Sequence, residues 1–457
     1  TSACRLTLEA LPRANSPTEA QLNPAGRHIG ASLSDDALIR RYVMCLISEA
    51  YRYAISRRKF LRQACTLAAA PVMMGASAGA LAAPNLAATP RHLAVDARTK
   101  LVLLGTAGGP TWWPHNPSGA GGPERASAAS ALVVGDAIYL VDLGHGSAYR
   151  LAQAFNSGNF NTDGVQAGYQ TYLSNLKAIF FTHLHMDHTT DYPAILLCGY
   201  AAGIGTSPDP NEPAMPVQVY GPANRGQLEK DIYKLHVPVV NPQNPTPGTV
   251  EMTDYLWQAY AQTINDFTRD NGYPDFTELF DIHDIALPKR LPGFQSPNTT
   301  PCVPMAPFEI FRDRNVVVHA ILVDHHQVFP SYAFRFDTAE GSVVFSGDTG
   351  PDTKGNLQRL AAGADILVHE VIDQAWITAT FGPPSTWDVA TEALVTHLET
   401  AHTLIGDVGS VAQDAGVGTL VLSHIVPGNA PLAHLLGVTG FSGQLIIGED
   451  LMQVPVG

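Results

Sequence analysis

Three histidines and one aspartate lie close together in THLHMDH, residues 182–188. In an extended segment, residues two apart point the same way, so His183 and His185 can converge on one ion. If the chain then turns, Asp187 and His188 can reach a second ion. Imidazole nitrogen and carboxylate oxygen are ligands of zinc and of other first-row metals.

A solvated, histidine-rich surface loop is the alternative interpretation of this stretch. The apolar run LKAIF precedes it and predicts a buried strand, and an ordered segment is expected to follow. Surface loops of that kind rarely connect two buried elements. We therefore interpret the stretch as half of a two-metal site.

Three further segments could supply the missing ligands. They are VDHH with His325 or His326, FSGDTG with Asp348, and LSHIVP with His424. Each follows or ends an apolar run, where a lone Asp or His more often serves a turn or cap. Together they would complete the shells of two metal ions.

The elements that must position these residues alternate between short β-rich runs and helical stretches from Lys100 onward. The predicted strands are KLVLLGTAGG, the two halves of SALVVGDAIYLVDLGHG, LKAIFFTH, PVQVYGP, VVVHAILV, SYAFRFDT, SVVFSGDT, ADILVHEV, GTLVLSHI and QLIIGEDL. Helices are predicted at SAYRLAQAFN and at residues 191–200, 223–235, 355–362 and 403–415. This mixture of hairpins and strand–helix alternation indicates an α/β fold whose sheets are covered by helices.

Residues 237–315 break this rhythm with many prolines and aromatics and one expected helix around 251–268. We interpret them as an insertion between core elements that covers the active site. A disordered surface loop is the alternative.

The charge of the chain is unevenly distributed. The formal net charge is −14, but residues 1–83 carry 10 Lys and Arg against 5 Asp and Glu. The remaining 17 basic and 36 acidic residues give the rest a net charge of −19. Such a surface disfavours a long nucleic acid as partner and leaves a small anionic or aryl ester substrate.

Residues 56–83 have the layout of an export signal. SRRKFL is followed by an Ala-rich apolar run and a small-residue ending at Ala82. The stretch resembles a twin-arginine signal, which implies the twin-arginine export machinery as partner and a periplasmic or secreted mature chain. The apolar run is too short for a stable membrane span. Residues 1–55 are expected to be an upstream extension without a fold, or the true start lies near Met44.

Five cysteines without a CxxC pair argue against both a disulfide scaffold and a thiolate zinc site. After cleavage only Cys198 and Cys302 would remain, and their pairing is left open. The oligomeric state is also open, with a homodimer as one option.

Taken in order, THLHMDH, LVDH, FSGDTG and LSHIVP resemble the motifs of the metallo-β-lactamase superfamily. The segments LLGTAGGP, VYGP, LVHEV and AHTLIGDVGSVAQDAGVGTLVLSH are most similar to the branch of tRNase Z-type phosphodiesterases and their arylsulfatase-like relatives. The resemblance covers about residues 98–457 apart from the insertion. It implies a four-layer αββα sandwich with two divalent metal ions at one edge of its sheets. We expect Zn²⁺, with Mn²⁺ and Fe²⁺ as alternatives.

The resemblance also implies roles for individual residues. His183, His185 and His325 would hold the first metal, with His325 preferred to His326 because the motif has its histidine directly after Asp. The second metal would be held by Asp187, His188 and His424, and Asp348 would bridge the two. His402, in AHTL, matches a histidine near the leaving group.

These roles predict hydrolysis of a phosphodiester or an aryl sulfate or phosphate ester. Two metals would generate hydroxide near neutral pH and stabilise charge on the substrate. Asp187 would orient the nucleophile, and His402 would stabilise the transition state or protonate the leaving oxygen.

Other activities rank lower. An aspartate at position 348 disfavours antibiotic hydrolysis, because β-lactamases proper usually carry cysteine or histidine there, whereas lactone or ester opening stays an alternative. The export signal and the lack of a basic Gly-rich arm argue against tRNA processing. A redox or non-catalytic metal-binding protein is the alternative from another class.

Four further features have two interpretations each. TWWPHNP, residues 111–117, could line the pocket or pack as an aromatic loop. Asp191 could support a ligand histidine or cap a helix. His369 and Glu370, at a strand end, could support the metal shell or take part in catalysis, and we expect support of the metal shell.

Overall fold

The computed structural model describes residues 85–86, 97–113, 124–156, 170–207, 211, 213–231, 234 and 236–457. The predicted extension over residues 1–55, the export signal over 56–83 and His115 lie outside these residues.

Strands from the first half of the described chain, together with the C-terminal β15, build a seven-stranded mixed sheet. Its strands run in the spatial order β15-β2-β3-β4-β5-β6-β7. They are β15 (Gln453–Pro455), β2 (Thr99–Gly105), β3 (Ala129–Val134), β4 (Ala137–Val141), β5 (Leu176–Phe180), β6 (Val217–Pro222) and β7 (Phe280–Ile285). β3 and β4 form the predicted hairpin, and β4 to β7 pair in parallel.

Strands from the second half, together with the N-terminal β1, build an eight-stranded mixed sheet in the order β1-β14-β13-β12-β11-β10-β9-β8. Its strands are β1 (Asn85–Leu86), β14 (Gln444–Ile447), β13 (Thr419–Val426), β12 (Ile366–Ile372), β11 (Ser342–Phe345), β10 (Tyr332–Asp337), β9 (Val317–Leu322) and β8 (Phe308–Arg312). β11 to β14 are parallel, so their carboxyl ends share one edge of the sheet.

The two sheets pack face to face, and β2 shows how. Leu101 and Leu103 belong to a core cluster that includes Phe334 of the other sheet. Val102 and Leu104, which point to the opposite face, pack in a second cluster with helix residues. Because both faces are covered, all seven residues of β2 are buried.

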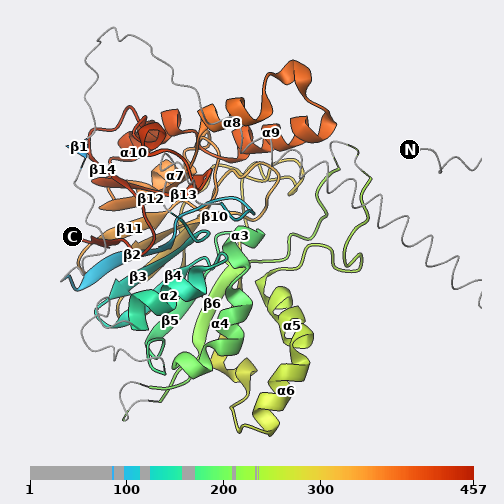
Figure 1. Cartoon of the computed structure of the whole chain (residues 1–457), viewed down its shortest axis with the longest axis vertical. Coiled ribbons are helices and arrows are strands. Elements are labelled where there is room, and N and C mark those ends of the chain that lie inside the picture. Colours follow the sequence, from blue (N-terminus) through green and yellow to red (C-terminus); the bar gives the residue numbers. More distant parts are fainter. Residues whose placement is uncertain are drawn as a thin grey trace, which may run out of the picture. The chain divides into compact units, whose positions relative to one another are not determined.

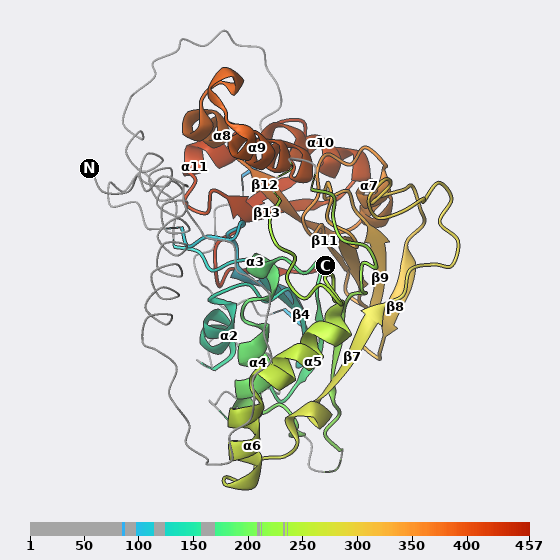
Figure 2. The same cartoon turned by 90° about the vertical axis from the view of Figure 1, so that its right-hand side faces the viewer.

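Helices cover the outer face of each sheet (Figures 1 and 2). The seven-stranded sheet carries α2 (Ser147–Asn156), α4 (Tyr192–Cys198), α5 (Thr249–Ala259) and α6 (Ala261–Arg269) on its side. The eight-stranded sheet carries α7 (Asn356–Ala361), α8 (Gln374–Phe381), α9 (Val389–Ala401) and α10 (Ile405–Ala415). The predicted four-layer αββα sandwich is confirmed. None of the helices in the described ranges is long and apolar enough to cross a membrane.

Most predicted elements are present, but two predictions differ from the structure. No helix forms among the described residues of 223–235, where 227–230 are exposed and offer no apolar face to a neighbour. Conversely, α8 and α9 were not predicted, although Asp373 and Asp388 cap them through the backbone N–H groups of Ala375 and Thr391.

Residues 237–315, which we interpret as an insertion, form regular structure rather than a disordered loop. The expected helix is present as two, α5 and α6, but the stretch also supplies β7 and β8. β7 pairs with β6 at the edge of one sheet, and β8 pairs with β9 at the edge of the other. The stretch is therefore part of the sandwich, because each sheet takes an edge strand from it.

Candidate metal centre

The segment after β5 carries the first four candidate ligands. His185 has extended backbone angles (φ −66°, ψ 154°), so the side chains of His183 and His185, two residues apart, point the same way as expected. The chain then enters the short helix α3 (Met186–Thr189), which contains Asp187 and His188. All of these ligands belong to the seven-stranded sheet.

The other three candidates come from the eight-stranded sheet. His325 follows β9, Asp348 follows β11, and His424 lies within β13 near its end. All three side chains are buried, with exposed fractions of 5% or less. The centre therefore lies where strand ends of the two sheets meet.

These side chains form two groups that share one carboxylate. The first group is His183, His185, His325 and Asp348, and the second is Asp187, His188, Asp348 and His424; within each group the candidate ligand atoms lie within 4.8 Å of one another. Asp348 Oδ2 is 3.8 Å from Nε2 of both His183 and His325. It is also 3.1 Å from His424 Nε2, while Oδ1 is 3.3 Å from His188 Nε2. Asp348 is thus placed between the groups, as a bridging ligand would be.

The neighbouring histidines at 325 and 326 are placed differently. His325 is fully buried, and its Nε2 lies 3.4 Å from His185 Nδ1. Its Nδ1 donates to the carbonyl of Ala401 at 2.8 Å, which orients Nε2 toward the group. His326 has a positive φ of 51°, is half-buried and belongs to neither group.

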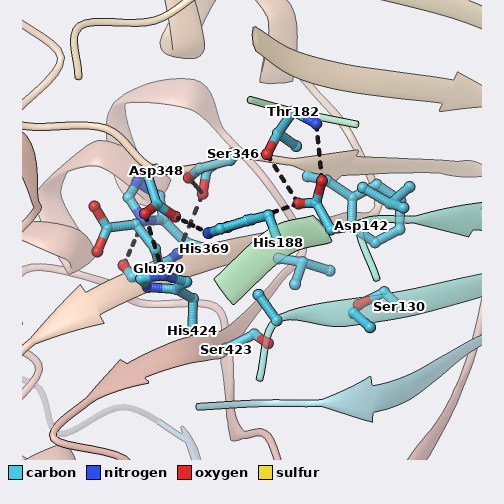
Figure 3. A pocket seen from close by; sticks show the side chains of 16 residues that line it. Ser130, Asp142, Thr182, His188, Ser346, Asp348, His369, Glu370, Ser423 and His424 are labelled. Carbon is cyan, nitrogen blue, oxygen red and sulfur yellow. Dashed lines mark hydrogen bonds and ion pairs between the residues drawn. The ribbon is translucent and has the colours of Figure 1, made fainter. Parts of the chain in front are cut away.

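A carboxylate that the sequence analysis missed supports the second group. Asp142, directly after β4, is buried and lies 2.9 Å from His188 Nδ1 through Oδ2 (Figure 3). The same carboxylate accepts hydrogen bonds from the backbone N–H and the hydroxyl of Thr182, each at 2.8 Å. The contact fixes the tautomer of His188 with Nε2 facing the centre. The signal was available, because Asp142 ends a predicted strand as Asp348 does.

The glycine turn after β2 closes the second group from another side. The backbone N–H of Gly109 donates to Asp187 Oδ2 at 2.7 Å. Gly108 lies directly against the ring of His424, and a Cβ at that position would overlap the imidazole. The sequence GTAGG therefore has glycine where the backbone approaches a ligand closely.

The protonation tendencies divide the cluster into two sets. Burial lowers the pKa of His183 and of His325 well below the usual value, so both rings are neutral. Burial alone would raise the pKa of Asp348, but His424 and His188 hold it well below its usual range. Burial opposes protonation of His424, yet Asp348 and the hydrogen bond to Asp187 raise its pKa to about 10. Asp348 is thus an anion among nitrogen donors.

The donor set fits two divalent cations. His183 Nε2, His188 Nε2 and Asp348 Oδ1 are buried without a hydrogen-bond partner in the structure, which is costly unless another group binds them. A cation bound by these atoms would satisfy all three and replace the proton on the charged histidines. Nitrogen and carboxylate donors suit zinc and equally manganese or iron, so they do not select the metal.

A second pair of side chains lies beside the two groups. His402, the C-cap of α9, has Nδ1 3.1 Å from Glu370 Oε1 and 4.0 Å from Asp348 Oδ2. Glu370 Oε1 also accepts the backbone N–H groups of Thr349 and Thr403. Burial alone would lower the pKa of His402, but Glu370 raises it. Glu370 therefore orients His402, and the two converge with the candidate ligand His424 in a third group whose ligand atoms lie within 4.8 Å of one another. His369 Nδ1 faces the carbonyl of Glu370 instead.

The structure also places the other residues for which the sequence left two interpretations open. Asp191 accepts the backbone N–H of Ala148 at 2.9 Å, so its carboxylate caps the start of α2 and touches no ligand histidine. Trp113 donates from Nε1 to the carbonyl of Gly108, whereas Trp112 is 80% exposed. Cys198 and Cys302 are both free, the first exposed and the second buried.

One further histidine faces the site and was not identified from the sequence. The ring centroid of His397, on α9, lies 5.6 Å from that of His325, 5.7 Å from His402 and 6.3 Å from His185. Burial, with His402 and His185, lowers its pKa to about 3. Its position could not be inferred because α9 was not predicted.

Comparisons with known proteins agree with this architecture. No protein-family model matches the chain. Ribonuclease Z of Mycobacterium marinum is 27% identical over 338 residues, which cover 73% of this chain and 94% of that protein.

Two solved structures are also similar. They are human tRNase Z, short form (18% identity, 78% of this chain and 99% of that one, TM-score 0.46), and the metallo-β-lactamase fold protein YhfI from Bacillus subtilis (16%, 78% and 99%, TM-score 0.43). The chain is thus similar in sequence to ribonuclease Z proteins over most of their length.

Proposed function

We propose that this chain is a dinuclear metal-dependent hydrolase that cleaves phosphodiester or related anionic ester bonds. The observation that carries the proposal is the pair of ligand groups sharing Asp348, in which buried atoms of His183, His188 and Asp348 have no hydrogen-bond partner among the described residues. The similarity to ribonuclease Z over nearly the whole length of that protein supports phosphorus–oxygen bonds as the target class.

In this proposal His183, His185 and His325 hold one metal, and Asp187, His188 and His424 hold the other, with Asp348 between them. Bound metals would supply a hydroxide nucleophile near neutral pH and neutralise charge on the ester oxygens. The residues of the chain hold and orient these groups.

Two side chains have roles in the reaction itself. Asp187, fixed by the N–H of Gly109, orients the attacking water. His402 lies beside the bridging carboxylate and is held by Glu370, which favours its protonated form. It therefore donates a proton to the leaving oxygen or a hydrogen bond to the transition state.

Small aryl phosphodiesters and aryl sulfates are the first candidate substrates, because the sequence downstream of residue 83 is strongly acidic. RNA is the second candidate, and the ribonuclease Z relatives favour it. Lactone or ester opening by the same metals is a further alternative.

The test is a substrate panel run on the metal-loaded chain together with Asp348→Ala. We expect about two divalent ions per chain and hydrolysis of an aryl phosphodiester, with both lost in Asp348→Ala. Asp365→Ala is the matched control, because Asp365 binds Ser342 at the opposite end of β11, and it should retain metals and turnover. Full activity in Asp348→Ala would contradict the two-metal assignment. Faster cleavage of a structured RNA than of any aryl ester would make RNA the substrate.

We also propose that the chain is exported. The proposal rests on SRRKFL and the Ala-rich run before Ala82. In a bacterial host with a twin-arginine system, the unaltered chain should appear in the periplasmic fraction in shortened form. Arg57→Lys with Arg58→Lys should retain it inside the cell at full length, and equal export of both forms would contradict the proposal.

A further inference from the structure

His397 lies beside the first ligand group without belonging to it. It lies on α9, four residues before Ala401, so one helical turn separates the two residues on the same face. The carbonyl of Ala401 accepts the hydrogen bond from His325 Nδ1. The helix that carries His397 is therefore attached directly to the first ligand group.

The end of α9 is held in place by several contacts. The Thr403 hydroxyl donates to the carbonyl of Thr349 at 2.8 Å, and the backbone N–H of Ile372 donates to the carbonyl of Thr403 at 2.9 Å. Gly350 packs against the carbonyl of Thr400 closely enough that a Cβ would collide with it. Because Thr349 and Gly350 directly follow the candidate ligand Asp348, these contacts fix the end of α9, and with it His397, relative to the centre.

The ring of His397 is surrounded by other imidazoles. Besides His325, His402 and His185, His326 lies 6.3 Å away between centroids. His397 is nevertheless not among the atoms that converge within 4.8 Å in either ligand group. His397 therefore lies next to the candidate metal ligands but is not one of them.

The surroundings of His397 indicate an open position. The residue is half-buried, and among the described residues it makes ring contacts but no hydrogen bond. His185 beside it is also half-buried, and the neighbouring Met186 is 64% exposed. The first ligand group is therefore accessible on the side that His397 borders, and one ring nitrogen of a neutral imidazole always carries a donor proton.

We propose that His397 donates a hydrogen bond to the anionic group of the substrate ester and so binds the substrate over the first ligand group. This inference rests on the proposed hydrolase function and adds a substrate-binding residue to it. The group recognised is a phosphoryl or sulfuryl oxygen that is not transferred to His397, so no bond to the side chain forms or breaks. A structural histidine would instead affect folding or metal content.

The experiment compares the metal-loaded full chain with His397→Ala, His397→Gln and the control Glu392→Gln, an exposed residue of the same helix. Metal content, kcat and KM for bis(4-nitrophenyl) phosphate, and the dissociation constant of inorganic phosphate by calorimetry are measured. Loss of one hydrogen bond to an anion should raise KM and weaken phosphate binding by about tenfold or more, with little change in kcat or metal content. His397→Gln, which keeps a donor, should recover part of the loss, and Glu392→Gln should match the unaltered chain.

Two outcomes would overturn the inference. Unchanged KM and phosphate affinity in His397→Ala would exclude the proposed contact between His397 and the substrate. Loss of metal in that variant would instead show that His397 supports metal binding. If the unaltered chain hydrolyses no ester, the proposed function fails by itself. Phosphate binding by calorimetry then still decides the role of His397, because it requires no turnover.

Discussion

Replacing Asp142 by Asn should weaken the second metal site while the first remains intact. The carboxylate accepts from His188 Nδ1 at 2.9 Å and from two groups of Thr182 at 2.8 Å each. Asn has the same shape and tolerates the positive φ of 59° at this position, so the backbone gains little strain.

The amide cannot reproduce these three contacts. If its oxygen faces the backbone N–H of Thr182, its NH₂ group faces the N–H of His188 and the hydroxyl of Thr182. If the amide flips, its NH₂ group faces the backbone N–H of Thr182 instead. His188 can relieve the first conflict only by moving its proton to Nε2, the atom that faces Asp348 at 3.3 Å. A proton there blocks metal binding, and loss of such a carboxylate typically lowers metal affinity about 10- to 100-fold.

The assay is a competition titration of each protein against a chromophoric chelator, which resolves two binding steps. The unaltered chain should show two steps, and Asp142→Asn should keep one and weaken the other. Asp373→Asn is the matched control, because that buried carboxylate also pairs with a histidine, His434 Nδ1 at 2.6 Å, and binds a backbone N–H. Unchanged steps in Asp142→Asn, or equal weakening in both variants, would refute the assignment of Asp142 to His188.

Three other outcomes are expected. Gly108→Ala should displace His424 and so reduce both the metal occupancy of the second site and kcat. Gly406→Ala is the control and should change neither, because the space around its Cβ position is open. Metal analysis and steady-state kinetics check this, and a fully active Gly108→Ala would contradict the close approach of Gly108 to His424. His402→Ala should lower kcat by about 10²- to 10⁴-fold with metal content retained, and the deficit should shrink for substrates with better leaving groups if His402 protonates the leaving oxygen. Chelation of the metals should lower the thermal unfolding midpoint by several degrees, because buried ligand atoms lose their partners; an unchanged midpoint despite metal loss would count against a built metal centre.

Local patterns in the sequence predicted helix-covered sheets and candidate ligands at strand ends, whereas the four-layer sandwich and the division of the ligands between two metals followed from the family resemblance. Apolar runs with two-residue spacing identified the buried strands, and Asp348 and His424 follow or end such runs. Parallel strands then bring their ends to one edge, so residues far apart in the chain meet. His325 could be preferred to His326 only by resemblance, since spacing alone does not indicate which ring is turned inward.

The features that were missed depend on tertiary contacts. β7 and β8 are edge strands in a proline-rich stretch, where the periodic signal is short and most positions are only partly buried. Residues 389–401 offer a helix signal in Asp388 as N-cap, but nothing local indicates that His397 faces His325. Asp142 could have been identified by the strand-end rule, yet its pairing with His188 follows from the packing of α3 against the end of β4.

The distribution of ligands over the two sheets connects metal binding to the packing of the whole sandwich. His183, His185, Asp187 and His188 belong to the seven-stranded sheet, and the other three candidates belong to the eight-stranded sheet. Each group combines donors from both, so neither cation could bind fully to a single sheet. Binding free energy at the centre therefore stabilises the contact between the sheets directly. A change at that contact far from the ligands, such as Phe334→Ala between β10 and β5, should weaken metal affinity as well as lower stability.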